Sequence, residues 1–279
     1  MNTSPKIGLA LGGGGARGLA HIPVLEAFDE LGLKPAVIAG SSAGALIGAA
    51  YAGGMSGREI REHALALLSN KMDMARHVFG TKQAKLGDIF SLRGLTSLHL
   101  DGQKLADIAL PDHLPQMIED QKIPFKVIVT DYERMEEVVL ISGSVLQAVG
   151  ASIAIPGFIV APRIDGRIHV DGGIKNPVPF DHVRDNMDFV VAVDVTGRPK
   201  PIKRNYPSNL ELAEGSLFIM FHELASLRRA QSPPDIYIEP DISQFTAADF
   251  FKVRDIFAAA EPSKEILKRA LDLRFSAKA

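Results

Sequence analysis

The sequence predicts an α/β fold, a three-layer α/β/α sandwich with a mostly parallel central sheet. Short apolar runs alternate along the chain with segments whose apolar residues recur at the helical period, as in sheets that carry helices on both faces. The run FVVAVDV at 189–195 is almost entirely apolar, as a buried parallel strand should be. Two uncharged stretches, 35–57 and 138–162, contain glycine, serine or proline breaks, so we assign both to the protein interior rather than to membrane spans.

Strands are predicted where short apolar runs are bounded by glycine, proline or polar residues. These runs cover 6–11, 36–39, 125–130, 138–141, 158–161, 167–171, 189–195 and 236–239. Helical segments separate many of these runs, which is the order that a sheet covered on both faces requires.

Helices are predicted where apolar residues recur every three to four positions. The segment 18–31 follows the first strand and is ended by Gly32. The segment 42–52 carries small residues four positions apart, which allows another backbone to approach it closely. Further helices are predicted at 145–151, within 205–229 and within 247–275, where Pro262 begins a new helix.

The chain contains no internal repeat, low-complexity tract or flexible linker, so we expect 1–279 to be a single domain. Its motifs lie in a core at 6–197, and a helical portion follows at 205–275. The region 70–120 has no clean period and is predicted to be either a helical insertion or a mobile lid.

Composition limits the classes of function. The net charge of −2 provides no basic field that would attract nucleic acid, so no nucleic-acid partner is expected. The absence of cysteine excludes disulfides, zinc–thiolate sites and cysteine nucleophiles. The apolar stretch at the N-terminus is short and broken by glycines, unlike a signal peptide, so we expect a cytoplasmic protein.

The stretch GSSAG places a serine between a predicted strand and a predicted helix. Only Ser42 fits the pattern G-x-S-x-G, with Gly40 and Gly44 on either side, and Ser41 is out of register. At such an elbow the hydroxyl points away from the sheet, and the helix that starts at Ala43 aims its N–H groups at charge forming near the serine. Ser42 is therefore a candidate nucleophile. The alternative is that it only caps the helix, which serine does well.

The stretch GGGGARG at 12–18 follows the first strand and opens the first helix. It contains G-x-G-x-x-G at Gly13, Gly15 and Gly18, which raises the possibility of dinucleotide binding. That function requires an acidic residue at the end of the second strand, and none is present there. A phosphate-binding P-loop is excluded as well, because no Gly-Lys-Ser/Thr follows.

With these two functions excluded, the glycine loop is interpreted as an anion-binding site. Its backbone N–H groups lie unshielded at a helix N-terminus, where they can bind an anion. If Ser42 attacks an acyl carbonyl, the resulting oxyanion needs such donors. Arg17 would support this cradle electrostatically, or alternatively form a surface salt bridge.

A nucleophilic serine needs a base, and the eight histidines do not supply an evident one. His182 and His222 come late enough for the order Ser, Asp/Glu, His, but neither follows a predicted strand beside a glycine loop. His182 lies in a charged stretch and is expected to be exposed, and His21 lies on the first helix in a core or surface role.

Asp171 is a better candidate for the base, because it ends the strand RIHVD and is followed by Gly172 and a second glycine. If the strands run parallel, its carboxylate lies at the same sheet edge as Ser42. A carboxylate serves as a base when a sheltered site raises its pKa. The alternative for Asp-Gly-Gly is a hairpin turn. Asp131 and Asp194 also end strands and are weaker candidates.

GGGxRG, GxSxG and DGG, in this order and on these elements, resemble the patatin-like phospholipase family. The resemblance extends to GGGGARGLAHIPVLE at 12–26, ASIAIPGF at 151–158 and VDGGIKNPVP at 170–179. It covers roughly 6–197 and fades after that. It implies a three-layer α/β fold and a Ser–Asp dyad without a catalytic histidine.

Carried over by motif, the resemblance implies that Ser42 is the nucleophile and Asp171 the base. The oxyanion hole would be formed by Gly13, Gly14, Gly15 and Ala43, and the supporting residues would be Arg17, Gly40, Gly44 and Gly172. Many relatives have Asp-Gly-Ala where this chain has Asp-Gly-Gly, and the smaller glycine should have no consequence. The scheme needs no metal and no cofactor.

The expected substrate is a lipid or another acyl ester, of the lysophospholipase, phospholipase A or carboxylesterase type. A transient contact with a membrane surface is compatible with Phe245, Phe250, Phe251 and Phe257, although packing of these rings on the core is the simpler expectation. Two other functions remain open: an esterase with a Ser-His-Asp triad that uses His182 or His222, and a non-enzymatic regulatory module that keeps the motifs only to bind an anion or a partner.

Overall fold

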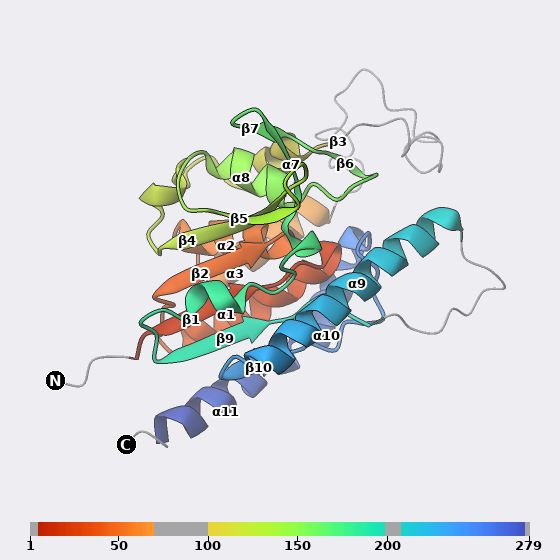
Figure 1. Ribbon diagram of the computed structural model, residues 1–279. Coiled ribbons are helices and arrows are strands. Elements are labelled where there is room, and N and C mark those ends of the chain that lie inside the picture. Colours follow the sequence, from red (N-terminus) through yellow and green to blue (C-terminus); the bar gives the residue numbers. More distant parts are fainter. Residues whose placement is uncertain (1–4, 70–99, 199–207, 277–279) are drawn as a thin grey trace.

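The computed structural model describes residues 5–69, 100–198 and 208–276, and its central element is an eight-stranded mixed sheet (Figure 1). Five neighbouring strands of this sheet run parallel. In sheet order they are β10 (Ile236–Ile238), β9 (Phe189–Val193), β1 (Ile7–Leu11), β2 (Val37–Ser41) and β4 (Phe125–Asp131). The mostly parallel sheet predicted from the apolar runs is confirmed.

The other three strands are antiparallel and surround the end of β4. They are β5 (Glu136–Leu140), β7 (Arg163–Ile164) and β8 (Arg167–Asp171). One edge of β4 pairs with β2 through Phe125–Ile128 and then with β8 through Val129–Asp131, while β5 pairs with the opposite edge. The strand predicted at 158–161 lies outside this sheet. It is β6 (Ile159–Val160), which pairs with β3 (Leu100–Asp101) in a separate two-stranded sheet.

Helices cover both faces of the sheet, which gives the three layers that the sequence predicts (Figure 1). The α-helices are α1 (His21–Glu30), α2 (Ala43–Ala52), α3 (Gly57–Leu68), α7 (Gly102–Ala109), α8 (Val145–Ser152), α9 (Asn209–Gln231), α10 (Val253–Ala260) and α11 (Pro262–Ser276). Short 3₁₀ helices include η1 (Gly15–Ala20), η3 (Gly172–Ile174) and η4 (Phe180–Val183). The helix predicted over 18–31 is therefore divided, because the glycine loop winds as η1 before α1 begins. Pro23 lies in the first turn of α1, where its missing N–H leaves no bond unmade.

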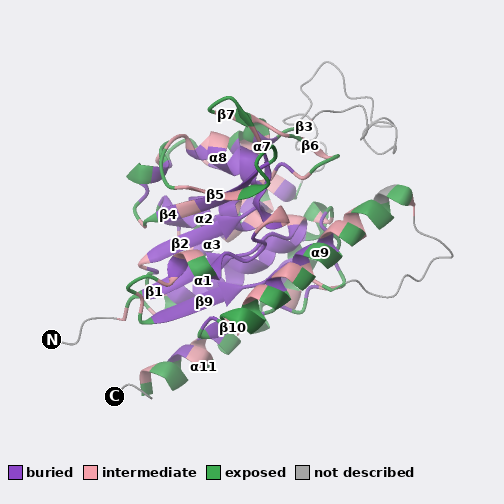
Figure 2. Ribbon diagram, viewed as in Figure 1, coloured by how far each residue is buried: buried purple, intermediate pink, exposed green. Residues whose placement is uncertain are grey.

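Alternate side chains of the central strands enter two separate clusters, as the two-residue period of a strand requires. Leu9 and Val191 point into the larger cluster, which the helices α1, α2, α10 and α11 line. Ala10 and Ala192 point to the opposite face, where η4 and Ala225 of α9 cover them. Figure 2 shows the buried strands enclosed between helices whose outer faces are exposed.

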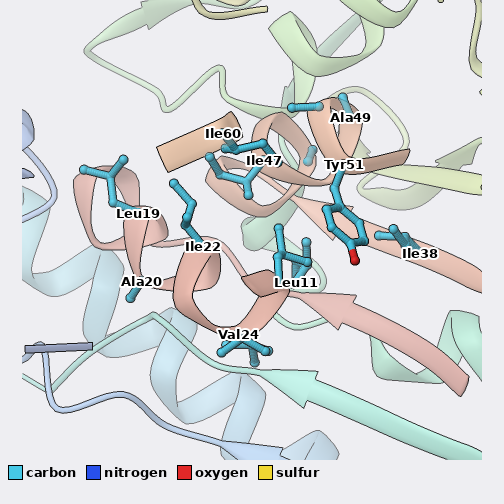
Figure 3. Close-up of a cluster of buried hydrophobic side chains, with 14 of the residues drawn as sticks. Leu11, Leu19, Ala20, Ile22, Val24, Ile38, Ile47, Ala49, Tyr51 and Ile60 are labelled. Carbon is cyan, nitrogen blue, oxygen red and sulfur yellow. The ribbon is translucent and has the colours of Figure 1, made fainter. Parts of the chain in front are cut away.

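The larger cluster joins distant parts of the chain. Leu11 of β1, Ile22 of α1 and Ile47 of α2 point toward one another in Figure 3. Ile256 of α10 and Leu267 of α11 belong to the same cluster and are fully buried. The C-terminal helices therefore complete the core that the N-terminal strands begin.

The region 70–120 was predicted to be a helical insertion or a mobile lid, and its residues 70–99 lie outside the described residues. Its described part contains β3, α7 and the 3₁₀ helix η2 (Ile118–Asp120). Helix α7 packs against α8, and its Ala106 is fully buried in the larger cluster. Residues 100–120 are therefore a helical insertion packed on the core.

Two features bear on membranes. Of the helices in the described residues, none combines the length and the continuous hydrophobicity needed to cross a bilayer. The four C-terminal phenylalanines divide into two pairs. Phe245 and Phe257 are buried, whereas Phe250 and Phe251 are 42% and 38% exposed. Core packing thus explains only the first pair.

Candidate active site

Ser42 lies on a sharp turn between β2 and α2, as the G-x-S-x-G pattern predicts. Its backbone angles are φ 52° and ψ −122°, a conformation that residues other than glycine rarely adopt. Such strain persists only when the surrounding structure holds it in place, and it is characteristic of a nucleophile elbow. The side chain of Ser42 makes no capping bond to α2, so the alternative role of a helix cap is not supported. The residue is 3% exposed.

The small residues on either side of Ser42 are required by close backbone contacts. A Cβ on Gly44 would lie 2.0 Å from the carbonyl oxygen of Leu11, and a Cβ on Gly40 would lie 2.5 Å from the carbonyl oxygen of Gly44. No side chain fits at either distance, so both positions need glycine. Strand β1 can then approach the start of α2 and form one wall of the elbow.

Asp171 is the last residue of β8, and its carboxylate is held at both oxygens. Oδ2 accepts a hydrogen bond of 2.6 Å from Ser42 Oγ, and Oδ1 accepts one of 2.7 Å from the N–H of Gly173. The hydroxyl of Thr130 donates to the main-chain carbonyl of Asp171 at 3.0 Å. Asp171 is fully buried, and Gly172 after it packs against β4.

The strand directions that bring Ser42 and Asp171 together differ from those expected. A parallel strand was assumed for 167–171, but β8 runs antiparallel to β4. In the sheet Ser41 is opposite Ile128 and Asp171 is opposite the next residue, Val129. Strands β2 and β8 therefore point at each other along one edge of β4, and their C-terminal ends meet. The two side chains become neighbours by this head-to-head contact.

Burial changes the acidity of Asp171. Removal of the carboxyl group from water raises its pKa from 3.8 to about 7, although the hydrogen bonds from Ser42 and Gly173 act in the opposite direction. A carboxylate with a pKa near neutrality can both accept a proton and return it at neutral pH. The pair is therefore suited to activate a hydroxyl.

Comparison with known proteins agrees with this geometry. A family model described as patatin-like phospholipase matches residues 9–184. An uncharacterized NTE family protein of Mycobacterium bovis is 36% identical over 197 residues, which are 70% of this chain and 51% of that protein. The chain belongs to the patatin-like phospholipase family.

Other relatives in the patatin-like family are much longer. The human patatin-like phospholipase domain-containing protein 6 is 30% identical over 215 residues, which are 75% of this chain and 14% of that protein. The chain spans about half the length of the mycobacterial relative. Among solved structures, VipD from Legionella pneumophila aligns with 98% of this chain and 67% of its own, with a TM-score of 0.48 and 16% identity. Family membership rests on the sequence matches.

The glycine loop of this patatin-like protein offers fewer free donors than predicted. The N–H of Gly13 already donates to the carbonyl of Pro177 at 2.9 Å, so it is not available to an oxyanion, and that prediction is corrected. Among the described residues, no acceptor engages the N–H groups of Gly14, Gly15 or Ala43. These three remain the candidate donors.

Two side chains hold the loop in this shape. His21 Nε2 lies 2.8 Å from the carbonyl oxygen of Gly12, and the backbone N–H of Arg17 donates to the carbonyl of Gly14 at 3.2 Å. The Arg17 side chain also donates to Gly14, at 3.3 Å, and its guanidinium lies 4.3 Å from the ring centre of Phe218. Arg17 is buried, and among the residues that the structure describes it forms no salt bridge, unlike the surface pairing considered as an alternative. Burial lowers its pKa to about 10.

The contact between His21 and the loop was not predicted. Because a carbonyl oxygen only accepts, Nε2 must carry the proton in this contact. Burial lowers the pKa of His21 to about 4, so the imidazole is neutral. The sequence offered no signal beyond the position of His21, nine residues after Gly12.

The candidate triad histidines have other partners. His182 Nε2 lies 2.5 Å from a carboxylate oxygen of Glu137, and His222 Nδ1 lies 3.3 Å from the hydroxyl of Thr196. His182 is half-buried rather than exposed as expected, because this pairing holds it against β5. Within the described residues, the hydroxyl of Ser42 bonds to Asp171 and to no histidine.

The other two strand-end carboxylates are also occupied. Asp131 accepts the N–H groups of Glu133 and Arg134, so it shapes the turn after β4. Asp194 accepts hydrogen bonds from Thr196 and from the hydroxyl of Tyr237. Where the structure describes the chain, neither carboxylate bonds to the elbow, and both serve as turn or packing groups.

One cluster of possible metal ligands occurs in the described residues, formed by Glu137, Asp181 and His182. Arg228 of α9 donates to Glu137 at 3.0 Å and to Asp181 at 2.9 Å. Asn176 donates to the same two carboxylates. The cluster is an ion-pair network that fastens α9 to the sheet.

Sequence reasoning did not identify Ser152, the last residue of α8. Its hydroxyl accepts the backbone N–H of Ser42 at 2.8 Å and donates to the carbonyl of Ile128 at 2.6 Å. It lies in the stretch ASIAIPGF, which carried part of the family resemblance, so a signal was present but without a role attached to it.

Proposed function

We propose that this protein is a serine acyl-ester hydrolase that acts on lipid esters, of the lysophospholipase, phospholipase A or carboxylesterase type. The observation that carries the proposal is the bond of 2.6 Å between Ser42 Oγ and Asp171 Oδ2 at a strained elbow. Membership of a family described as phospholipases supports a lipid substrate. The mechanism below follows from this pair and the donors beside it.

In the acylation step, Asp171 accepts the proton of Ser42 as Oγ attacks the ester carbonyl carbon. The carbonyl oxygen becomes an oxyanion, and the free N–H groups of Gly14, Gly15 and Ala43 stabilise it. Collapse of the tetrahedral intermediate breaks the bond to the leaving alcohol. Asp171 returns its proton to that alcohol, and the acyl group stays on Ser42.

In the deacylation step, a water molecule donates a proton to Asp171 and attacks the acyl carbonyl. The second tetrahedral intermediate uses the same N–H donors. Its collapse releases the carboxylic acid, and the proton held by Asp171 returns to Ser42. The dyad alone carries the proton in both steps, so the proposal requires neither a histidine nor a metal.

The experiment is covalent labelling with a fluorophosphonate probe together with hydrolysis of a p-nitrophenyl ester. The native protein should be labelled and should turn over the ester, and S42A should do neither. A native protein that is neither labelled nor active would point instead to a regulatory module. A panel of phospholipids, lysophospholipids, acylglycerols and short esters, with S42A as control, then identifies the substrate class.

The triad alternative is tested in the same assay. We expect H182A and H222A to keep most of the activity, because neither side chain bonds to Ser42. We expect D171N to lose it by about 10²-fold or more, because the amide cannot accept the proton. Loss of activity in a histidine variant that keeps its fold would contradict the dyad.

The proposal includes a transient contact with lipid surfaces and a cytoplasmic location, and the absence of cysteine is compatible with a reducing compartment. Phe250 and Phe251 are exposed near Ala247, which packs with Phe218 of α9. Sedimentation with phosphatidylcholine vesicles should recover part of the native protein and less of the double variant F250S/F251S. Equal recovery of both would exclude these rings from the contact.

A further inference from the structure

The end of helix α8 contacts the backbone of both proposed catalytic residues. The N–H of Ser42 donates to the hydroxyl of Ser152 at 2.8 Å, and the N–H of Asp171 donates to the carbonyl of Ala154 at 3.1 Å. Two residues that are 129 positions apart in the chain are thus held by one three-residue segment. The segment connects their positions to each other.

The hydroxyl of Ser152 both donates and accepts a hydrogen bond. A serine hydroxyl has one proton to donate, and here it goes to the carbonyl of Ile128 at 2.6 Å. An oxygen lone pair accepts the N–H of Ser42. Ser152 is completely buried, so water cannot replace it in either bond. Ile128 lies opposite Ser41 in the sheet, and the hydroxyl therefore ties the elbow to strand β4.

This bond acts on a strained part of the backbone. Ser42 has a positive φ of 52°, and its peptide N–H must point in one direction for Oγ to face Asp171. The bond to Ser152 fixes that direction. It also occupies the N–H of the nucleophile itself, so the oxyanion must be stabilised by the N–H groups of the glycine loop and Ala43 instead.

We propose that Ser152 is a positioning residue for the nucleophile: through the Ser42 N–H it holds Ser42 Oγ at hydrogen-bonding distance from Asp171. The inference rests on the proposed hydrolase function. Loss of the hydroxyl leaves the N–H of Ser42 and the carbonyl of Ile128 buried without partners. The elbow then relaxes, and a small displacement of an attacking atom costs up to about 10²-fold in rate.

The test compares S152A with S41A in steady-state hydrolysis and in fluorophosphonate labelling. Both variants remove a buried hydroxyl at the elbow, but Ser41 Oγ has no hydrogen-bond partner among the described residues. We expect S152A to lower kcat and the labelling rate by about 10- to 100-fold with KM little changed. S41A should keep both rates. Circular dichroism and thermal unfolding confirm that each variant is folded.

If S152A does not fold, S152C carries the test, because its somewhat larger thiol leaves no cavity at this position but bonds weakly. Its kcat should fall while KM stays near the native value. Native kcat in a folded S152A or S152C would overturn the inference and leave the proposed function intact, as would an equal loss in S41A. A native protein that neither turns over ester nor becomes labelled would overturn the proposed function and the inference together.

Discussion

The carboxyl group of Asp171 is completely buried, and within the described part of the chain it accepts hydrogen bonds from two donors, the hydroxyl of Ser42 and the N–H of Gly173. These donors do not compensate for the water that the carboxylate loses on folding, and its pKa rises to about 7. The same burial that makes the ionised form costly also makes it a stronger base. At the scale of single residues, the acidity of one group links the fold to the reaction.

The pH dependence of kcat/KM follows from this pKa. Asp171 accepts a proton only when it is ionised, so activity should rise about tenfold per pH unit on the acid side and level off above a midpoint near pH 7. The profile should be measured with an ester whose leaving group is detected independently of pH. A midpoint near 4 would show that Asp171 is not the base or is not buried during the reaction.

At the scale of elements, the contact between β1 and the start of α2 sets the geometry of the elbow. The contact depends on Gly44, whose position leaves no room for a side chain beside Leu11. Helix α9 contains a glycine in open surroundings, Gly215, where an added Cβ would meet no atom within 4 Å. The two glycines therefore provide a matched comparison.

We expect G44A to lower the free energy of unfolding by about 3 kcal/mol and to abolish ester hydrolysis, because the added methyl group displaces either β1 or the elbow. The control G215A should raise the free energy of unfolding by about 0.5–1 kcal/mol, since alanine loses less backbone entropy than glycine in a helix. Urea unfolding and the ester assay measure both effects. An active, stable G44A would contradict the close contact.

At the scale of the whole molecule, the N-terminal strands and the C-terminal helices share one hydrophobic cluster. Ion pairs reinforce the connection, since Glu26 of α1 binds both Arg61 of α3 at 2.6 Å and Lys264 of α11 at 2.7 Å. We propose that the chain folds as a single domain. A destabilising substitution in α11 should then lower the stability of the entire structure.

Two leucines of α11 test this proposal. Leu267 is fully buried, and Leu273 is 73% exposed. L267A should lower the free energy of unfolding by about 2–5 kcal/mol, whereas L273A should change it by less than about 0.5 kcal/mol. Calorimetry should show one transition that shifts as a unit in L267A. A separate low-temperature transition would show that the C-terminal helices form an independent unit.

Much of the fold was determined by local pattern. Apolar runs and helical spacing predicted the central strands and the main helices, because the side-chain period of each element is a local property. The elbow at Ser42 was predictable for the same reason, since a strand, a tight turn and a helix follow one another within a few residues. The glycines around Ser42 and the proline that begins α11 are also local signals.

Only the tertiary structure decided how the site is assembled. Strand β8 runs antiparallel to β4, and its pairing joins residues far apart in the chain. The same is true of the hydrogen bonds from the Gly13 N–H to Pro177 and from the Ser42 N–H to Ser152. The pKa of Asp171 is raised chiefly by burial of its carboxyl group, which depends on packing between distant segments. Local sequence restricts the conformation of each segment, but strand direction, hydrogen-bond partners and desolvation are properties of contacts between segments.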